Sequence, residues 1–269
     1  MAKERIGFLG AGQMAEAIAR GIVSAKMAEP SMLIASDPDA ARRDLFREMG
    51  ARAGEDNLAV VKEADTLIIA VKPQTLAELL TQIGSVLREK QRIISICAGV
   101  PTTVIEAASK RKLRVVRAMP NLPMRVRMGA TALCPGKHAT AQDMALAGKI
   151  FSAGGRAVEV KEELMDAVTA LSGSGPAYFY FLVEVMIEAG VQEGLNPTVA
   201  RTLAIQTARG AAEMMAAADA SPEELRRRVT SKAGTTEAAF KKIEELKVRE
   251  GLKAAIAAAA ARARELGKR

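Results

Sequence analysis

The chain has 269 residues, of which 49% are hydrophobic and 26% charged, enough apolar material for one large domain or two modest ones. Its 39 basic residues outnumber its 31 acidic ones, but they are scattered, and aromatic residues make up only 3%. This disfavours a nucleic-acid partner, because proteins that bind nucleic acid concentrate Lys and Arg and interleave aromatic residues. The net charge of +8 fits a small anionic ligand instead.

Cysteine usage and hydropathy indicate the compartment. Cys97 and Cys134 lie in apolar stretches without the spacing of metal ligands, so we expect two buried thiols and no metal site. No segment approaches the run of about 18 apolar residues that a membrane span needs. We therefore expect a cytoplasmic protein with no membrane partner.

Short apolar runs alternate with amphipathic ones over the first 160 or so residues, as in an α/β fold whose mainly parallel sheet has helices on both sides. Buried strands are predicted at 5–9, 32–36, 66–71, 92–96, 113–117 and 131–134. Helices are predicted at 14–25, 40–49, 74–87, 102–108 and 141–151.

After about residue 163 no further strand pattern appears, and helices are predicted at 177–193, 197–217, 222–229, 236–246 and 249–266. The pattern predicts a doubly wound Rossmann domain at 1–162 and an all-helical domain at 163–269. Residues 178–183 are apolar around the whole helix circumference, so this helix must be buried on every side. We expect it to pack in a subunit interface.

A dinucleotide fingerprint opens the chain. The first predicted strand runs into Gly10-Ala11-Gly12-Gln13-Met14-Ala15 and then a helix, the G-x-G-x-x-A pattern in its strand–turn–helix setting. Gly10 permits the tight turn, Gly12 lets a pyrophosphate approach the backbone, and Ala15 lets helix and strand pack closely. The N-terminus of the helix offers free N–H groups to the phosphates.

The second strand ends at Ser36-Asp37-Pro38, where the adenosine ribose would be recognised. Asp37 would favour NAD, whereas Ser36 with Arg42 and Arg43 would hold a 2′-phosphate and favour NADPH, the alternative we prefer. Asp37 could instead merely cap the helix that begins near Asp39.

Three later loops also follow strand ends, at 72–74, 97–99 and 119–123, and should flank the cofactor. The one histidine, His138, lies in a Pro-Gly-Lys loop and is expected at the surface. A reductase without a histidine proton relay suits a substrate that is already activated, such as an iminium ion.

The chain resembles the pyrroline-5-carboxylate reductase family, whose members reduce a cyclic imino acid to proline with NAD(P)H. The resemblance spans nearly the whole chain, and its last two stretches are the most specific. The stretches are GFLGAGQMA (7–15), AVKPQ (70–74), RAMPN (117–121), LSGSGPAY (171–178) and VTSKAGTT (229–236).

The resemblance implies a Rossmann domain followed by a helical dimerisation domain, with a homodimer as the basic unit and five dimers in many larger assemblies. It implies that the loop from Ser231 to Thr236 holds the substrate carboxylate through backbone N–H groups, including those around Gly234 and Thr235, with the catalytic Thr236 hydroxyl near the ring nitrogen. The cofactor-binding positions it implies are Gly10, Gly12, Gln13, Met14, Ser36, Asn57, Ala70, Lys72, Pro73, Ala98 and Gly99.

Details of two segments stay open. Thr235 could simply cap the helix predicted at 236–246. Many members have Pro-Gly where this chain has Lys232-Ala233, and because Ala233 is less permissive than glycine at positive φ, the detailed shape of the loop stays open. Lys232 could attract the carboxylate or point to water. For the turn before residue 177 we favour a packing role over substrate contact by Ser174.

Three rival functions are weighed. A β-hydroxyacid dehydrogenase shares this layout but needs a catalytic lysine, and neither Lys161 nor Lys232 lies inside a long predicted helix. A non-catalytic nicotinamide-binding regulatory protein is the second rival. A nucleic-acid-binding role ranks last.

Overall fold

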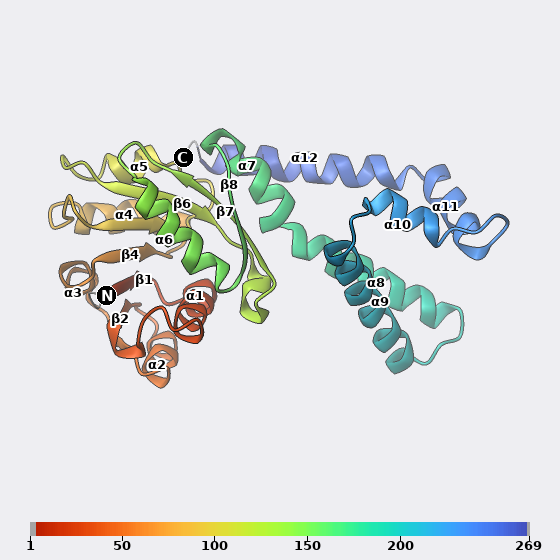
Figure 1. Ribbon diagram of the computed structural model, residues 1–269, viewed down its shortest axis with the longest axis horizontal. Helices are drawn as coiled ribbons and strands as arrows, with labels where there is room; N and C mark the ends of the chain where they lie inside the picture. Colours follow the sequence, from red (N-terminus) through yellow and green to blue (C-terminus); the bar gives the residue numbers. More distant parts are fainter. Residues whose placement is uncertain (1–3, 268–269) are drawn as a thin grey trace. The chain divides into compact units, whose positions relative to one another are not determined.

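The computed structural model describes residues 4–267 and contains one eight-stranded sheet in the order β3-β2-β1-β4-β5-β6-β7-β8 (Figure 1). Strands β1 to β6 are parallel, β7 runs antiparallel to β6, and β8 is parallel to β7. The predicted doubly wound α/β fold is confirmed. The strands are β1 (Ile6–Leu9), β2 (Leu33–Ser36), β3 (Arg52–Gly54), β4 (Thr66–Ile69), β5 (Arg92–Ser95), β6 (Arg114–Met119), β7 (Gly129–Pro135) and β8 (Gly155–Glu159).

The helices of the first part of the chain connect these strands. They are α1 (Gln13–Ser24), η1 (Pro30–Met32), α2 (Ala40–Glu48), α3 (Asn57–Glu63), α4 (Pro73–Ile83), α5 (Thr102–Glu106), η2 (Leu122–Val126) and α6 (Ala141–Ser152). Those that follow the sheet are η3 (Glu162–Leu164), α7 (Met165–Val168), η4 (Thr169–Gly173), α8 (Gly175–Gln192), α9 (Pro197–Ala217), α10 (Pro222–Arg228), α11 (Thr235–Glu245) and α12 (Val248–Leu266).

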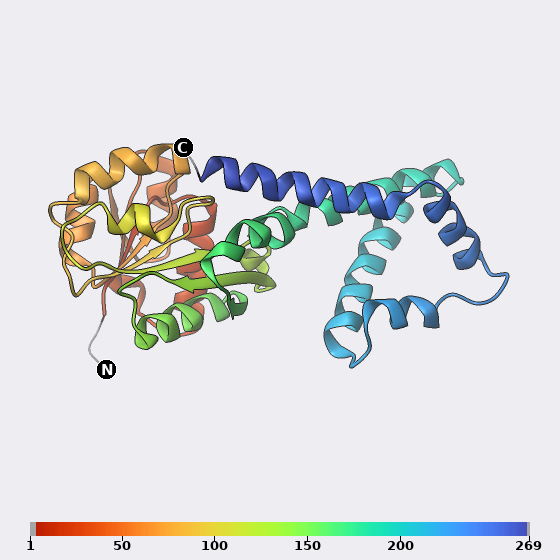
Figure 2. The same cartoon turned by 90° about the horizontal axis from the view of Figure 1, so that it is seen from above.

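Alternate strand residues build a separate core on each face of the sheet, because successive side chains of a strand point to opposite sides. On β4 and β5, Ile68 and Ile94 pack with α1, α2 and α6. Their neighbours Leu67 and Ile93 pack with α3 and α4 instead. Figure 2 shows α4, in orange, and α6, in green, on opposite sides of the strands. Burial on both faces explains why the central strands are continuous apolar runs.

Besides η1 to η4 and the four-residue α7, three elements were not predicted from the sequence. Strand β3 has three residues and β8 is an edge strand with mostly exposed or half-buried residues, so neither forms an apolar run. Helix α3 has seven residues, too few for a clear 3.6-residue period. Its start is set locally, because the Asp56 side chain accepts a hydrogen bond from the Leu58 N–H at 2.8 Å.

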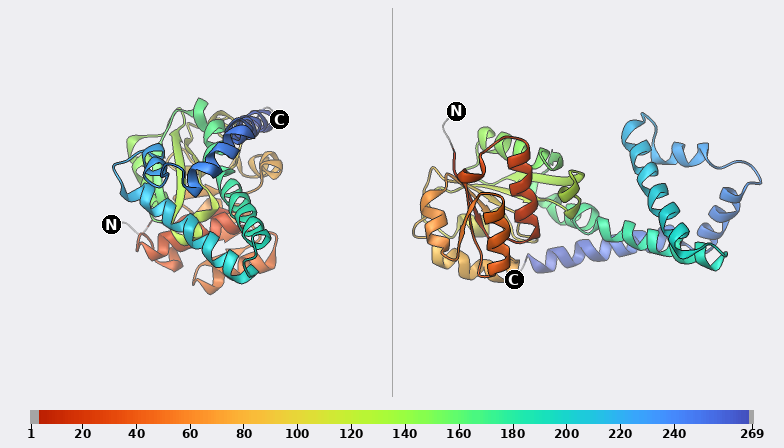
Figure 3. Two further views of the ribbon diagram at one scale, coloured as in Figure 1. Left: turned by 90° about the vertical axis from the view of Figure 1, so that its right-hand side faces the viewer. Right: turned by 90° about the horizontal axis from the view of Figure 1, so that it is seen from below.

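By internal contacts the chain divides into two compact units, the residues up to Ser174 together with those from Ala259 onward, and Gly175–Ala258. The predicted boundary after residue 162 stays a prediction. In the second unit α8 packs against α9 (Figure 3). The α8 side chains Phe179, Tyr180 and Phe181 are 62%, 63% and 61% exposed in the single chain. This large apolar surface is typical of a subunit interface.

Candidate cofactor cleft and substrate loop

Gly10 makes the turn between β1 and α1. Its φ is +95°, a backbone conformation that L-residues with side chains rarely adopt. A Cβ at this position would lie 2.8 Å from the backbone oxygen of Ala70, so the neighbouring strand leaves it no space. The Gly10 N–H donates to the Ser36 carbonyl at 2.8 Å. The turn is thus held against the ends of β2 and β4.

Gly12 is the N-cap of α1 and serves a different purpose. Its φ of −64° suits any residue, and no described atom lies within 4 Å of where its Cβ would stand. No described side chain caps the helix, so the first-turn N–H groups keep their donors free. An open helix N-terminus beside a glycine fits a pyrophosphate, which needs donors and close backbone approach.

A cleft of about 820 Å³ lies at this turn, where β1, β2 and β4 end, within the size range of small-molecule sites. Two further expected positions, Pro73 and Gly99, line a separate cavity of about 370 Å³, and Met14 and Ala98 line neither. The expected cofactor residues that line the cleft are Gly10, Gly12, Gln13, Ser36, Asn57, Ala70 and Lys72. The cleft also includes residues that the sequence did not indicate, because they lie on helix faces without a motif: Thr75, Glu78, Leu79 and Gln82.

Ser36 and Asn57 form one hydrogen-bonded group at the end of β2. The buried Ser36 hydroxyl donates to Asn57 Oδ1 at 2.6 Å, and Asn57 Nδ2 donates to Gln82 Oε1 at 2.8 Å. A neutral hydroxyl therefore stands at the strand end, backed by two amides.

Asp37, the next residue, turns its carboxylate toward backbone N–H groups. Its Oδ2 accepts from the Ala11 N–H at 2.7 Å, and its Oδ1 accepts from the Asp39 N–H at 2.9 Å. The helix cap of α2 is Asp39, whose side chain accepts from the Ala41 N–H. An N-cap side chain accepts from the N–H two or three residues further along the chain, and here Asp39 does so. The alternative that Asp37 caps this helix is therefore wrong.

The two nearby arginines differ. Arg43 donates through Nη1 to the carbonyls of Asp37 and Pro38, at 2.8 and 2.9 Å, and pairs with Glu55. Arg42 lines the cleft and makes a looser pair with Glu16, with 3.8 Å between Nη1 and Oε2. Arg42 is thus the guanidinium with donors available to an anion in the cleft.

The substrate loop expected at Ser231–Thr236 leads into α11. Ala233 has φ +58°, so it adopts the left-handed conformation that glycine favours. The N-cap of α11 is Gly234, and no described side chain caps the helix. The reading of Thr235 as the cap is therefore wrong, since Thr235 is already the first helical residue. First-turn N–H groups at Thr235 and Thr236 have no intrahelical acceptor and can bind a carboxylate.

Contacts around this loop explain its shape. The Ala233 N–H donates to Glu237 Oε2 at 3.0 Å, and the Gly234 N–H donates to the Ser231 carbonyl at 3.1 Å. Thr236 is half-buried, whereas Lys232 is exposed. An alanine at positive φ costs about 1 kcal/mol relative to glycine, and these two hydrogen bonds offset part of that cost.

The 171–178 stretch begins inside a π-helical turn, η4, which packs on the end of β6 and the residues that follow it. A Cβ on Gly173 would lie 2.5 Å from Met119 Cε, so the flexible end of the Met119 side chain would have to shift. Asn121 Nδ2 donates to the Ser172 carbonyl at 3.0 Å, and Asn121 Oδ1 accepts from the Ala130 N–H at 2.8 Å. Gly173 therefore has a packing role, and the Asn121 side chain links the Met-Pro-Asn segment to η4 and to β7.

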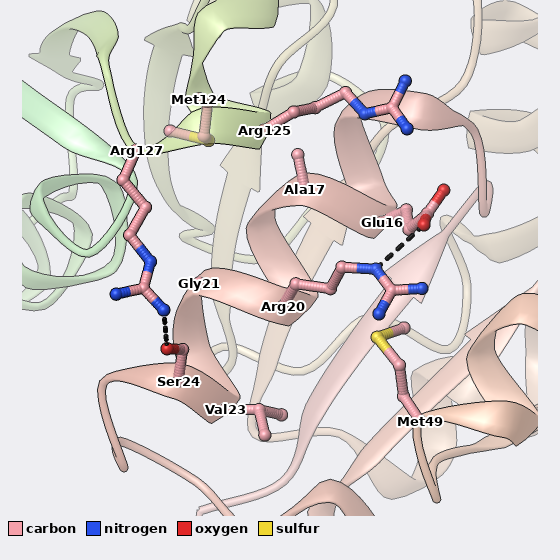
Figure 4. A pocket seen from close by; sticks show the side chains of 10 residues that line it. All are labelled: Glu16, Ala17, Arg20, Gly21, Val23, Ser24, Met49, Met124, Arg125 and Arg127. Carbon is pink, nitrogen blue, oxygen red and sulfur yellow. Dashed lines mark hydrogen bonds and ion pairs between the residues drawn. The ribbon is translucent and has the colours of Figure 1, made fainter.

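Another cavity, of about 460 Å³, lies between α1 and η2 (Figure 4). Its lining includes Arg20, Arg125 and Arg127, and Arg20 Nε donates to Glu16 Oε1 at 2.9 Å. None of the expected site residues lines it.

Both thiols are buried and free, and neither is activated. Burial raises the pKa of Cys97 to about 11. Burial and then the Glu162 charge raise the pKa of Cys134 to about 12. Among residues 4–267, no cluster of three His, Cys, Asp or Glu side chains suits a metal ion, and none of the helices is long and apolar enough to cross a membrane.

Comparison with known proteins gives the family. The family model described as pyrroline-5-carboxylate reductase dimerisation matches residues 162–266. A second family model, described as NADP oxidoreductase coenzyme F420-dependent, matches residues 5–99. The chain is 43% identical to the pyrroline-5-carboxylate reductase of Methanosarcina acetivorans, with 100% of both chains covered. It belongs to the pyrroline-5-carboxylate reductase family.

Solved structures agree with this assignment. A pyrroline-5-carboxylate reductase from Coxiella burnetii is 36% identical, with a TM-score of 0.91 and 99% of this chain and 100% of that one covered. A pyrroline carboxylate reductase from Plasmodium falciparum, solved with NADP bound, is 30% identical, with a TM-score of 0.90 and 99% of each chain covered. The family resemblance and the two-part fold expected from the sequence are confirmed.

Proposed function

We propose that this chain reduces 1-pyrroline-5-carboxylate to L-proline with a nicotinamide cofactor and prefers NADPH. One observation carries the cofactor part: a cleft formed by a glycine turn, where the position of a Gly12 Cβ is open and the N-terminus of α1 is uncapped. The proposed substrate rests on membership of the pyrroline-5-carboxylate reductase family.

In this reaction the protein mainly binds and orients the cofactor and the imine. When bound, the cofactor supplies a hydride to the C=N carbon of the imine, whose protonated nitrogen accepts the electron pair and becomes the amine of proline. The first turn of α1 binds the pyrophosphate, and the first turn of α11 binds the substrate carboxylate. The Thr236 hydroxyl lies near the ring nitrogen and hydrogen-bonds to it. Orientation of this kind supplies much of the rate acceleration that an activated substrate needs.

The preference for NADPH rests on Arg42. Both Asp37 oxygens already accept backbone N–H groups, whereas Arg42 lines the cleft beside the neutral Ser36. A charge-assisted hydrogen bond contributes about 1.5–3 kcal/mol, so Arg42→Ala should raise the KM for NADPH roughly tenfold or more and leave that for NADH nearly unchanged. Arg125→Ala removes the same charge from the cavity beside η2 and serves as the control. Equal KM changes for the two cofactors would contradict the preference.

The working enzyme is a homodimer built through α8. Its support is the exposed apolar face of that helix and the dimerisation model that covers it. A strict monomer by light scattering at micromolar concentration would refute the dimer. The assembly of five dimers and a cytoplasmic location stay predictions, to be checked by mass photometry and by cell fractionation.

The deciding experiment follows nicotinamide absorbance with purified protein, pyrroline-5-carboxylate, and NADPH or NADH. Rapid oxidation that depends on the imine supports the reaction. Cofactor binding without turnover would favour a regulatory protein instead. Oxidation of a β-hydroxy acid would favour the dehydrogenase, although Lys161 precedes η3 and Lys232 lies in a loop, so neither is the helical lysine that chemistry requires.

A further inference from the structure

Asp37 follows β2 directly, near the place where an acid commonly binds the adenosine ribose. In this chain its Oδ2 instead accepts from the Ala11 N–H at 2.7 Å, inside the glycine turn. We propose that Asp37 is a positioning residue that holds the phosphate-binding turn in its binding shape, for NADH and NADPH alike. This inference rests on the proposed use of the cleft for a dinucleotide.

The turn needs such an anchor because Gly10 and Gly12 leave its backbone with unusual freedom. Two successive N–H groups are tied to the end of β2: that of Gly10 donates to the Ser36 carbonyl, and that of Ala11 donates to Asp37. Ala11 is fully buried, so loss of its acceptor would leave a buried donor unpaired. The turn would then relax away from the shape that presents the N-terminus of α1.

Asp37 is itself fixed on both sides, as an anchor must be. Its N–H donates to the Gly54 carbonyl at 3.1 Å, and its own carbonyl accepts from Arg43 Nη1 at 2.8 Å. Its second carboxylate oxygen accepts from the Asp39 N–H, which sets the side-chain rotamer. The carboxylate therefore reaches Ala11 without further ordering, and the bond costs little conformational entropy.

Two variants of equal charge isolate the bond to Ala11. Asp37→Asn has one acceptor oxygen for the two N–H groups, and it faces Ala11 because the Ala11 N–H is buried whereas the exposed Asp39 N–H can bond to water. Asp37→Ser keeps a hydroxyl for the Asp39 N–H but is too short for Ala11. Because both variants remove the same charge, any effect of that charge on a 2′-phosphate is common to both. The difference between them reports the bond.

The experiment measures the Kd of NADPH and of NADH by titration without substrate, and amide hydrogen exchange of the cofactor-free protein. Asp37→Ser should bind both cofactors about tenfold more weakly than Asp37→Asn, with faster exchange at Ala11. Equal Kd values for the two variants, or a difference for NADH alone, would overturn the proposal, and the latter would make Asp37 a ribose ligand. Failure of the proposed function would appear separately, as normal cofactor binding without turnover of the imine.

Discussion

The two glycines of the turn should respond to alanine in opposite ways. At Gly10 the methyl group would meet the Ala70 oxygen at 2.8 Å and the Val71 nitrogen at 3.1 Å, on a backbone with φ +95°. Such backbone strain costs about 1–3 kcal/mol. At roughly 2–4 °C per kcal/mol for a chain of this size, Gly10→Ala should lower the Tm by several degrees.

Gly12→Ala should leave the fold intact and damage binding. Its methyl group meets no described atom within 4 Å, and its φ of −64° is compatible with alanine. The loss of a glycine N-cap and the reduced entropy of the unfolded chain are each below about 1 kcal/mol and opposite in sign, so the Tm should stay nearly constant. The methyl group added at position 12 would, however, occupy the space through which a pyrophosphate approaches the backbone. Loss of one charge-assisted hydrogen bond, about 1.5–3 kcal/mol, raises the Kd roughly 10- to 150-fold.

Thermal melts and NADPH titrations of both variants check this pair. Gly148→Ala is the control, because Gly148 lies in α6, with space for a methyl group among the described residues, and outside the cleft. It should raise stability by up to about 1 kcal/mol and leave the Kd unchanged. If Gly12→Ala binds NADPH like the unmodified protein, the reasoning that places the pyrophosphate at this turn is refuted.

Three further predictions follow from the site and the core. Thr236→Ala should lower kcat with little change in the Kd of NADPH, as measured by steady-state kinetics and titration; equal losses would argue against a role at the ring nitrogen. Burial raises the pKa of Asp143, but hydrogen bonds from Arg114 and Thr140 outweigh it and hold that pKa below its ordinary value of 3.8. Asp143 therefore stabilises the fold above pH 3.8, and this contribution is lost as pH falls through the lower folded pKa. In urea melts, Asp143→Asn should lower the free energy of unfolding at pH 7 by about 3 kcal/mol and remove that part of the acid dependence. Cys97 and Cys134 should resist a thiol reagent at pH 7.5 until the protein unfolds, and fast labelling of the native protein would contradict their burial.

Much of the fold was predictable because its signals are local. Strands buried on both faces must be apolar throughout, so β1, β4 and β5 appear in the sequence within a residue or two of their observed bounds. The glycine turn is likewise encoded by adjacent residues, since positive φ and close approach both require glycine. The substrate and most of the site roles came from resemblance to a family, because no local pattern specifies which imine a loop will bind.

Tertiary contacts decided the rest. The sequence left Asp37 open as a ribose ligand or a helix cap, and its bond to Ala11 joins residues 26 positions apart, beyond the reach of any local pattern. The different roles of Arg42 and Arg43 were also decided by the structure. Backbone carbonyls and Glu55 engage the Arg43 guanidinium, whereas Arg42 lines the cleft. The close contact of Gly173 with the Met119 side chain also exists only because folding brings these distant segments together. A sequence specifies conformational preferences among near neighbours, whereas the partner of each polar group is set only when distant segments meet in the packed structure.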